Sequence, residues 1–103
     1  MSHTILLVQL DQDPLSRTYS DYETINACLN GVCKIFENHL QERHPGKLTI
    51  TYDASQLFQF IDQIADMSCL VYHHDTQVYT PHNKAWIKEK VYNMLKADAM
   101  KGK

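Results

Sequence analysis

Glycine and proline are scarce in this sequence, with three of each among 103 residues, and long apolar runs are missing. A chain that is 44% hydrophobic and 21% charged, with so few of these residues, has the composition of a folded protein. No apolar stretch approaches the roughly 20 residues that a membrane helix needs, so we expect no membrane partner. The length predicts one domain over residues 1–103, with a polar tail that frays from about residue 96.

An excess of positive charge is absent as well. The sequence carries 10 basic and 12 acidic residues, which gives a formal net charge of -2. Proteins that bind nucleic acid draw much of their affinity from neutralising phosphates with lysine and arginine. This charge balance therefore argues against direct contact with nucleic acid, and we expect no such partner.

The cysteines are few and odd in number, and no secretion signal follows the first methionine. This combination predicts a reducing compartment, either cytosol or nucleus, and free thiols. No local signature pairs any cysteine with a histidine as a nucleophile would require. We therefore expect Cys28, Cys33 and Cys69 to be small apolar core residues.

Histidines are the remaining candidates for chemistry, and there are six of them. His73 and His74 are adjacent, so on a strand they point to opposite faces and cannot hold one ion together. His39 and His44 have no cysteine at the spacing of a zinc finger. There is no glycine-rich phosphate loop either. We expect no metal, no cofactor and no catalytic residue, and hence no enzyme.

Hydrophobic periodicity predicts the elements and the fold class. Segments rich in aliphatic, β-branched or aromatic residues predict strands over residues 4–9, 47–52, 67–73 and 77–80. Apolar stripes predict helices over about residues 21–43, 53–66 and 81–96, with Ser20 or Thr18 capping the first. The order β-α-β-α-β-β-α predicts an α+β fold, in which three helices cover one face of a four-stranded antiparallel-type sheet.

One residue inside the long predicted helix does not fit a helix interior. Gly31 costs about 1 kcal/mol there relative to alanine. Two interpretations stay open for it. The glycine either permits the close approach of another backbone or is merely tolerated.

The first predicted strand is apolar on both sides. Leu6 and Val8 point to one face, and Ile5 and Leu7 point to the other. If the helices cover one face, the second face leaves a large apolar patch in water, which is unusual for a monomer. Burial of that patch is worth on the order of several kcal/mol at about 25 cal/mol per Å². We predict a twofold homodimer that packs sheet against sheet. The predicted interface residues are His3, Ile5, Leu7, Leu70, Tyr72 and Tyr79.

The tyrosines leave an alternative function open. Tyr52, Tyr72 and Tyr79 on predicted strands could stack the bases of single-stranded RNA, as aromatic sheets do in RNA-recognition domains. Against this alternative, the order of elements differs from that of RNA-recognition domains. The basic flanks that such a sheet needs are also missing.

A third group of residues lies at the predicted start of the long helix, beside the loop at residues 11–17. Tyr19 and Tyr22 could anchor a peptide partner there, although Tyr22 fits the apolar stripe of the helix equally well. Thr18 precedes Asp21 by three residues, which is the spacing of an acidophilic kinase site. A phosphate on Thr18 would then lie at a helix N-terminus, where the helix dipole favours it, while an unmodified Thr18 would simply cap the helix.

Several long blocks of the sequence stand together in a recognisable order: MSHTILLVQ, RTYSDYETIN, GVCK, ITYD-SQLF-FID, SCLVYHHDTQ-Y and NK-WIKEKVY, where a dash marks a residue outside the pattern. Over Met1 to about Leu95 the sequence resembles the enhancer of rudimentary homolog family. The segment Leu10–Leu15 and the last three residues fit the family less well.

The resemblance implies a small α+β homodimer that associates through its sheet and has no known catalytic activity. It also implies a nuclear adaptor, with the cytoplasm as a second compartment, that holds short peptide segments of RNA-binding or RNA-processing proteins. Contexts in the family include decay of selected transcripts and small-RNA biogenesis. Ile5 and Leu7 match the family's dimer-face positions, and Thr18 matches a proposed kinase site. A second proposed kinase site is altered here, because Thr24 is followed by Ala27 and not by an acidic residue.

Overall fold

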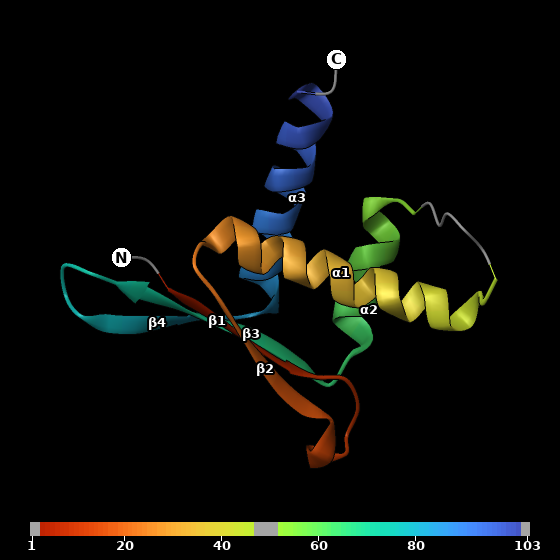
Figure 1. Cartoon of the computed structure of the whole chain (residues 1–103), viewed down its shortest axis with the longest axis horizontal. Helices are drawn as coiled ribbons and strands as arrows, with labels where there is room; N and C mark the ends of the chain where they lie inside the picture. Colours follow the sequence, from red (N-terminus) through yellow and green to blue (C-terminus); the bar gives the residue numbers. More distant parts are fainter. Residues whose placement is uncertain (1–2, 47–51, 102–103) are drawn as a thin grey trace.

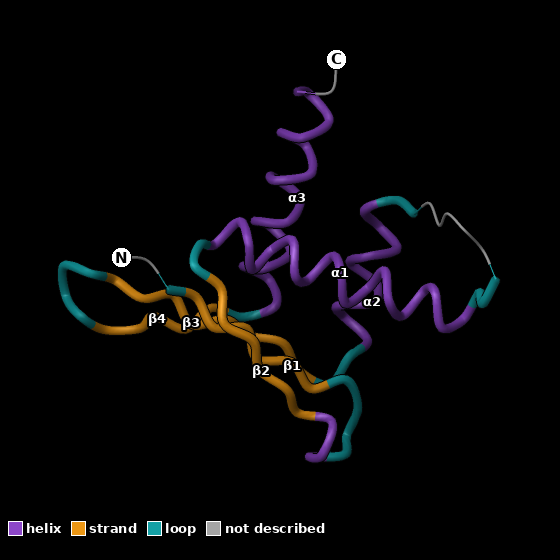
Figure 2. The backbone as a smooth tube through the Cα atoms, viewed as in Figure 1, coloured by secondary structure: helices purple, strands orange, loops and turns teal. Residues whose placement is uncertain are grey.

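The computed structural model describes residues 3–46 and 52–101, and it confirms the α+β fold class. A four-stranded antiparallel sheet lies on one side of the molecule, and three helices pack against one of its faces (Figures 1 and 2). The elements in chain order are β1 (Thr4–Gln9), the short 3-10 helix η1 (Pro14–Ser16), β2 (Arg17–Tyr22), α1 (Ile25–Arg43), α2 (Ala54–Gln63), β3 (Asp66–His73), β4 (Val78–His82) and α3 (Lys84–Lys101).

The sheet has the order β2-β1-β3-β4, and each strand runs antiparallel to its neighbours. The predicted first strand is confirmed at both ends, and the predicted third strand is confirmed with one residue added at its start. Tyr72 faces Tyr79 across the hairpin of β3 and β4, which is the pairing that a tight turn at Asp75-Thr76 predicts from the sequence. Pro81, predicted in the first turn of the last helix, lies instead in β4.

Strand β2 was not expected from the sequence. Its residues were predicted as the end of a loop and the start of the long helix. The prediction that Ser20 or Thr18 caps that helix is wrong, because Thr24 does so by accepting a hydrogen bond at Oγ1 from the Ala27 backbone N–H (3.0 Å). The strand predicted over residues 47–52 lies outside the described residues except for Tyr52, which belongs to no helix or strand.

Polar side chains cap the other two helices. Asp53 and Gln56 form a reciprocal capping box at the start of α2. At its far end, the Lys84 Nζ donates to the Ile64 carbonyl (2.6 Å) and so satisfies a backbone group that the helix leaves unpaired. Asn83 caps α3 by accepting from the Trp86 N–H. Helix α3 continues to Lys101, beyond the predicted start of fraying.

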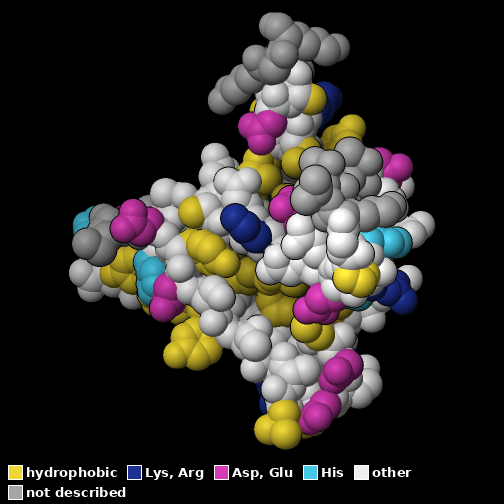
Figure 3. All heavy atoms as spheres, turned by 45° about the vertical axis from the view of Figure 1, so that its right-hand side comes forward, with side chains coloured by type: hydrophobic (Ala, Val, Ile, Leu, Met, Phe, Trp, Pro, Cys, Tyr) yellow, Lys and Arg dark blue, Asp and Glu magenta, His cyan; other side chains and the backbone are white. Residues whose placement is uncertain are grey.

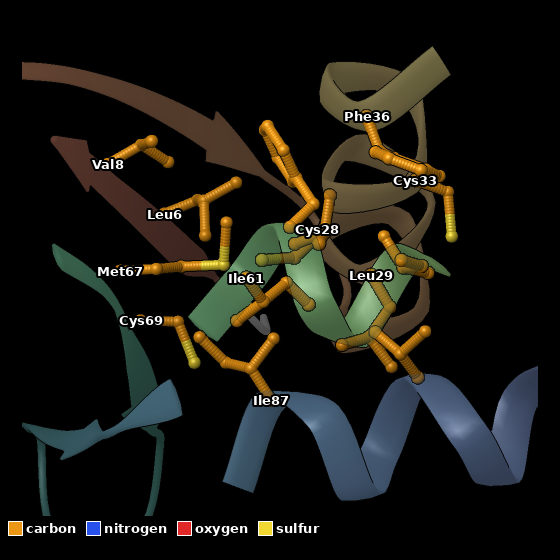
Figure 4. Close-up of a cluster of buried hydrophobic side chains, with 14 of the residues drawn as sticks. Leu6, Val8, Cys28, Leu29, Cys33, Phe36, Ile61, Met67, Cys69 and Ile87 are labelled. Carbon is orange, nitrogen blue, oxygen red and sulfur yellow. The ribbon is translucent and has the colours of Figure 1, made fainter. Parts of the chain in front are cut away.

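The core lies between the sheet and the helices (Figure 4). On the sheet, the buried side chains alternate with exposed ones: Leu6 is 1% exposed and Val8 5%, whereas Leu7 between them is 37% exposed. This alternation confirms that Leu6 and Val8 face the helices. All three cysteines are buried and free, also as predicted.

Gly31 lies where α1 crosses a side chain of the sheet. A Cβ atom at this position would lie 2.6 Å from Cζ and 3.0 Å from Cε1 of Tyr22, and closer still to the Tyr22 hydroxyl. Contacts between carbon atoms are normally 3.5 Å or longer. The predicted close approach therefore exists, but an aromatic side chain makes it and not a second backbone.

Candidate functional site

The side of the sheet that faces away from the helices is the candidate site, and we call it the open sheet face. The strand registers determine which side chains share it, because residues directly opposite each other point to the same side. Ile5 lies between Asp21 on β2 and Leu70 on β3. Leu7 lies between Tyr19 and Ser68, one pleat further along. The face comprises His3, Ile5, Leu7, Tyr19, Asp21, Ser68, Leu70, Tyr72, Tyr79 and Pro81.

The centre of the open sheet face is apolar. Leu7 is 37% exposed and Tyr79 40% exposed, while Ile5, Leu70 and Tyr72 are half-buried. The rings of Tyr72 and Tyr79 lie against each other with their centroids 5.1 Å apart. The structure thus brings all six of the predicted interface residues onto one surface.

A polar network borders this apolar centre. The Nε2 of His3 lies 3.2 Å from the Asp21 carboxylate, and its Nδ1 lies within hydrogen-bond distance of the Tyr79 hydroxyl. The network joins residues from three parts of the sheet. His3 immediately precedes β1, Asp21 is on β2 and Tyr79 is on β4. Sequence analysis missed Asp21 because it placed this residue in a helix.

The opposite end of the face is hollowed, and a projecting hairpin lies beside it. The hollow is lined by Leu7, Gln9, Arg17 and Ser68, among others, and the Arg17 Nε donates to the Gln9 Oε1 (2.9 Å). The hairpin tip carries Leu15, which is 90% exposed, and two acidic residues, Asp11 and Asp13, accompany it. Figure 3 shows this tip at the bottom as hydrophobic atoms beside acidic ones.

The three residues predicted at a helix start lie on β2 instead. Thr18 is the exposed second residue of this edge strand, so it neither caps a helix nor places a phosphate at a helix N-terminus. Tyr19 is 72% exposed and belongs to the open sheet face. Tyr22 points to the helix side and packs, half-buried, against the core. Tyr19 and Tyr22 therefore do not form one anchor.

A second hollow lies on the helix side, between β2 and the outer surface of α1. We call it the α1 hollow, and its lining residues are Tyr22, Ala27, Asn30, Gly31, Lys34, Ile35 and Asn38. Gly31 has no side chain, so the Tyr22 ring can lie directly on the helix. Sequence analysis missed this hollow because Tyr22 was assigned to the helix itself.

The tyrosines proposed to stack RNA bases do not share a surface. Tyr72 and Tyr79 lie on the open sheet face, but Tyr52 lies on the helix side of the molecule. There its ring packs edge-on against Phe36, and its hydroxyl donates to a carboxylate oxygen of Glu37 (2.8 Å). The three rings cannot form one stacking platform.

Comparison with known proteins places the chain in a family. The family model described as "Enhancer of rudimentary" matches residues 1–101. The chain belongs to the enhancer of rudimentary family. It is 60% identical to the protein enhancer of rudimentary of Drosophila virilis, over 96% of this chain and 95% of that one. It is 58% identical to the enhancer of rudimentary homolog of Echinococcus multilocularis (96% and 98% covered) and 40% identical to that of Arabidopsis thaliana (98% and 93% covered).

The described part of this enhancer of rudimentary family member contains no group of three His, Cys, Asp or Glu side chains that could hold a metal ion. Among the same residues, no helix is long and apolar enough to cross a membrane.

The cysteines of this family member are buried thiols held in their neutral form. Burial raises the pKa of Cys28 to about 12 and that of Cys69 to about 11, from an ordinary value of 9.0. Burial also raises the pKa of Cys33, with the nearby Glu37 adding to the effect. A thiol nucleophile needs the opposite shift, toward the thiolate. The three thiols therefore act as packing groups.

We expect these thiols to make the fold sensitive to alkali. Below about pH 9 they are protonated in both the folded and the unfolded chain. Above it only the unfolded chain releases the protons, so stability is lost as pH rises from 9 toward 11 or 12. The free energy of unfolding, measured with urea, should fall by about 1 kcal/mol for each of Cys28 and Cys69 between pH 8 and pH 10. Cys69→Ala should show a fall smaller by about 1 kcal/mol, and an equal fall would contradict this account.

Proposed function

We propose that this protein is a non-catalytic homodimeric adaptor. Two copies associate through the open sheet face, and each copy binds a short peptide segment of an RNA-processing or RNA-decay protein. The nucleus is the proposed compartment, with the cytoplasm second. Membership of the enhancer of rudimentary family supports this proposal through the resemblance described above.

The apolar centre of the open sheet face is the observation that carries the proposal. Ile5, Leu7, Leu70, Tyr72 and Tyr79 form one continuous apolar surface on a side of the sheet that none of the described helices covers. A second copy supplies the same surface by a twofold rotation, and its side chains are then removed from water. Covering this surface is favourable by about 25 cal/mol per Å² of apolar area.

Light scattering coupled to size exclusion tests the dimer. One chain has a mass of 12.0 kDa, so we expect a single species at twice that mass. A single species at the mass of one chain, at micromolar concentration, would contradict the proposal.

The α1 hollow is the site that we propose for the peptide. It is lined by the Tyr22 ring and by residues of α1, and among these Lys34 supplies a positive charge. The hollow lies on the helix side of the sheet, so a second copy on the open sheet face leaves it accessible. A dimer then presents two equivalent hollows, and partners that are themselves linked gain affinity through avidity.

Filling the α1 hollow should remove the peptide partners. Asn30 is an exposed residue that lines it, so Asn30→Arg introduces a long charged side chain there with little effect on the core. Affinity capture from nuclear extract, followed by cross-linking and peptide mapping, should lose the cross-linked RNA-processing proteins with this variant. The matched variant Asn93→Arg, at an exposed position on α3, should retain them. Equal capture by both variants would rule out this hollow as the peptide site.

The alternative function, binding of single-stranded RNA by strand tyrosines, has weaker support. Only Tyr72 and Tyr79 of the proposed rings share a surface, and the formal net charge of the chain is -2. That surface is also the one assigned to the second copy. A titration with single-stranded RNA that shows no binding at low salt would exclude the alternative.

A further inference from the structure

His3 occupies a position at which a change of charge can affect association of two copies. Both ring nitrogens are hydrogen-bonded, Nε2 to the Asp21 carboxylate (3.2 Å) and Nδ1 to the Tyr79 hydroxyl. The His3 side chain is 37% exposed and that of Asp21 60% exposed, so water still reaches both groups in a single copy. Both groups lie on the open sheet face, beside Ile5 and Tyr72.

The network can be fully hydrogen-bonded with the histidine either neutral or charged. A neutral ring donates a hydrogen bond from Nε2 to Asp21, and its Nδ1 accepts a hydrogen bond from the Tyr79 hydroxyl. A charged ring donates from both nitrogens, and the Tyr79 hydroxyl then accepts, because a phenol can play either role. Protonation of His3 therefore requires rotation of one hydroxyl hydrogen and no other change in this network.

When a second copy covers the open sheet face, the free energy of association differs between the neutral and the charged form of His3. With neutral His3, each copy would bring an uncompensated Asp21 carboxylate into the interface, and removing a lone charge from water is costly. With protonated His3, the same carboxylate belongs to an ion pair of zero net charge, in which His3 Nε2 lies 3.2 Å from Asp21 Oδ1. We propose that two copies take up protons at His3 as they associate through the open sheet face, so that the dimer is tighter at pH 6 than at pH 8. This inference rests on the proposed dimer.

Among the described residues, the groups that face His3 come from each neighbouring strand. They are Asp21 from β2 and Tyr79 from β4, while Tyr72 on β3 donates its backbone N–H to the His3 carbonyl. The histidines of the hairpin do not take part. His73 points to the side opposite Tyr72, and His82 stacks on Trp86 of α3.

The rate at which subunits exchange between two fluorescently labelled pools tests this proposal, and it is measurable even when the dimer is tight. The wild-type chain should exchange about fivefold more slowly at pH 6 than at pH 8, within the range where histidine changes charge. His3→Gln should remove the difference. Asp21→Asn should reverse its sign, because a protonated His3 would then enter the interface without a counter-charge.

His74→Gln is the matched control, since this histidine is exposed in the hairpin turn, and it should keep the wild-type ratio. A dimer whose exchange rate is equal at both pH values would overturn the proton linkage alone. So would a pH effect that survives in His3→Gln. A chain that is monomeric by light scattering at both pH values would instead overturn the proposed dimer.

Discussion

Replacement of Ile5 and Leu7 together by arginine is expected to give a folded monomer. Both side chains point away from the core, so the helices and the buried face of the sheet do not lose a contact. Twofold symmetry places four arginines in the interface, where they cannot all be hydrated or paired. We expect the dissociation constant to rise by about 1000-fold or more, which corresponds to about 4 kcal/mol. Light scattering should report the mass of one chain, with an unchanged circular dichroism spectrum.

The matched control for this variant is Tyr92→Arg. Tyr92 is a large apolar residue on α3 and is 49% exposed, so the change has similar chemistry away from the open sheet face. This control should remain dimeric. If the double variant at Ile5 and Leu7 stays folded and dimeric, the open sheet face is not the interface.

The second large effect is expected at Gly31. Gly31→Ala improves helix propensity by about 1 kcal/mol in an ordinary helix interior. Here the added methyl group collides with the Tyr22 ring, and since β2 pairing fixes the Tyr22 backbone, the ring must turn about its side-chain bonds to relieve the contact. Overpacking of this kind costs about 1–3 kcal/mol. The difference between these two terms is a net destabilisation of up to about 2 kcal/mol in urea unfolding, despite the better helix residue.

A double-mutant cycle isolates the collision. In a Tyr22→Ala background the space next to Gly31 is empty, so Gly31→Ala should stabilise the chain by about 1 kcal/mol. The sign of the effect thus reverses between the two backgrounds. A stabilising effect in both backgrounds would mean that the Tyr22 ring does not rest on the helix as the structure places it.

The sequence predicted the central strands and their two faces because alternation is a direct consequence of strand geometry. In β1 and β3, one side is sealed by helices, so the strict contrast between Leu6 and Leu7 follows from burial. The proposed dimer surface could be predicted from the same alternation, because the side chains on the uncovered side of the strand are apolar too. The network of His3 could not be inferred, because Asp21 was placed in a helix and the sequence does not reveal that β1 pairs with β3.

Strand β2 escaped prediction because it has no apolar period. It is an edge strand whose residues are exposed apart from Tyr22, and it is held in place by backbone pairing with β1. Two features of the sequence indicate a strand here. One is the β-propensity of Thr18 and Tyr19, and the other is the loop after β1, which suits a hairpin. The capping pattern of Ser20 and Glu23 competed with them, and local patterns cannot decide between a cap and a strand. Tyr19 and Asp21 were therefore placed on the wrong element.

The order of the sheet divides it into two hairpins, one from each end of the chain. Strands β1 and β2 are neighbours in sequence, as are β3 and β4, so each pair can form from contacts that are close in sequence. The seam between them joins Thr4 to Val71, so closing it requires a loop of more than half the chain, which is slow and entropically unfavourable. Ile5, Leu7 and Leu70 lie along this seam. A second copy that covers it would therefore hold together the one junction in the sheet that forms last, and folding and association would become coupled steps.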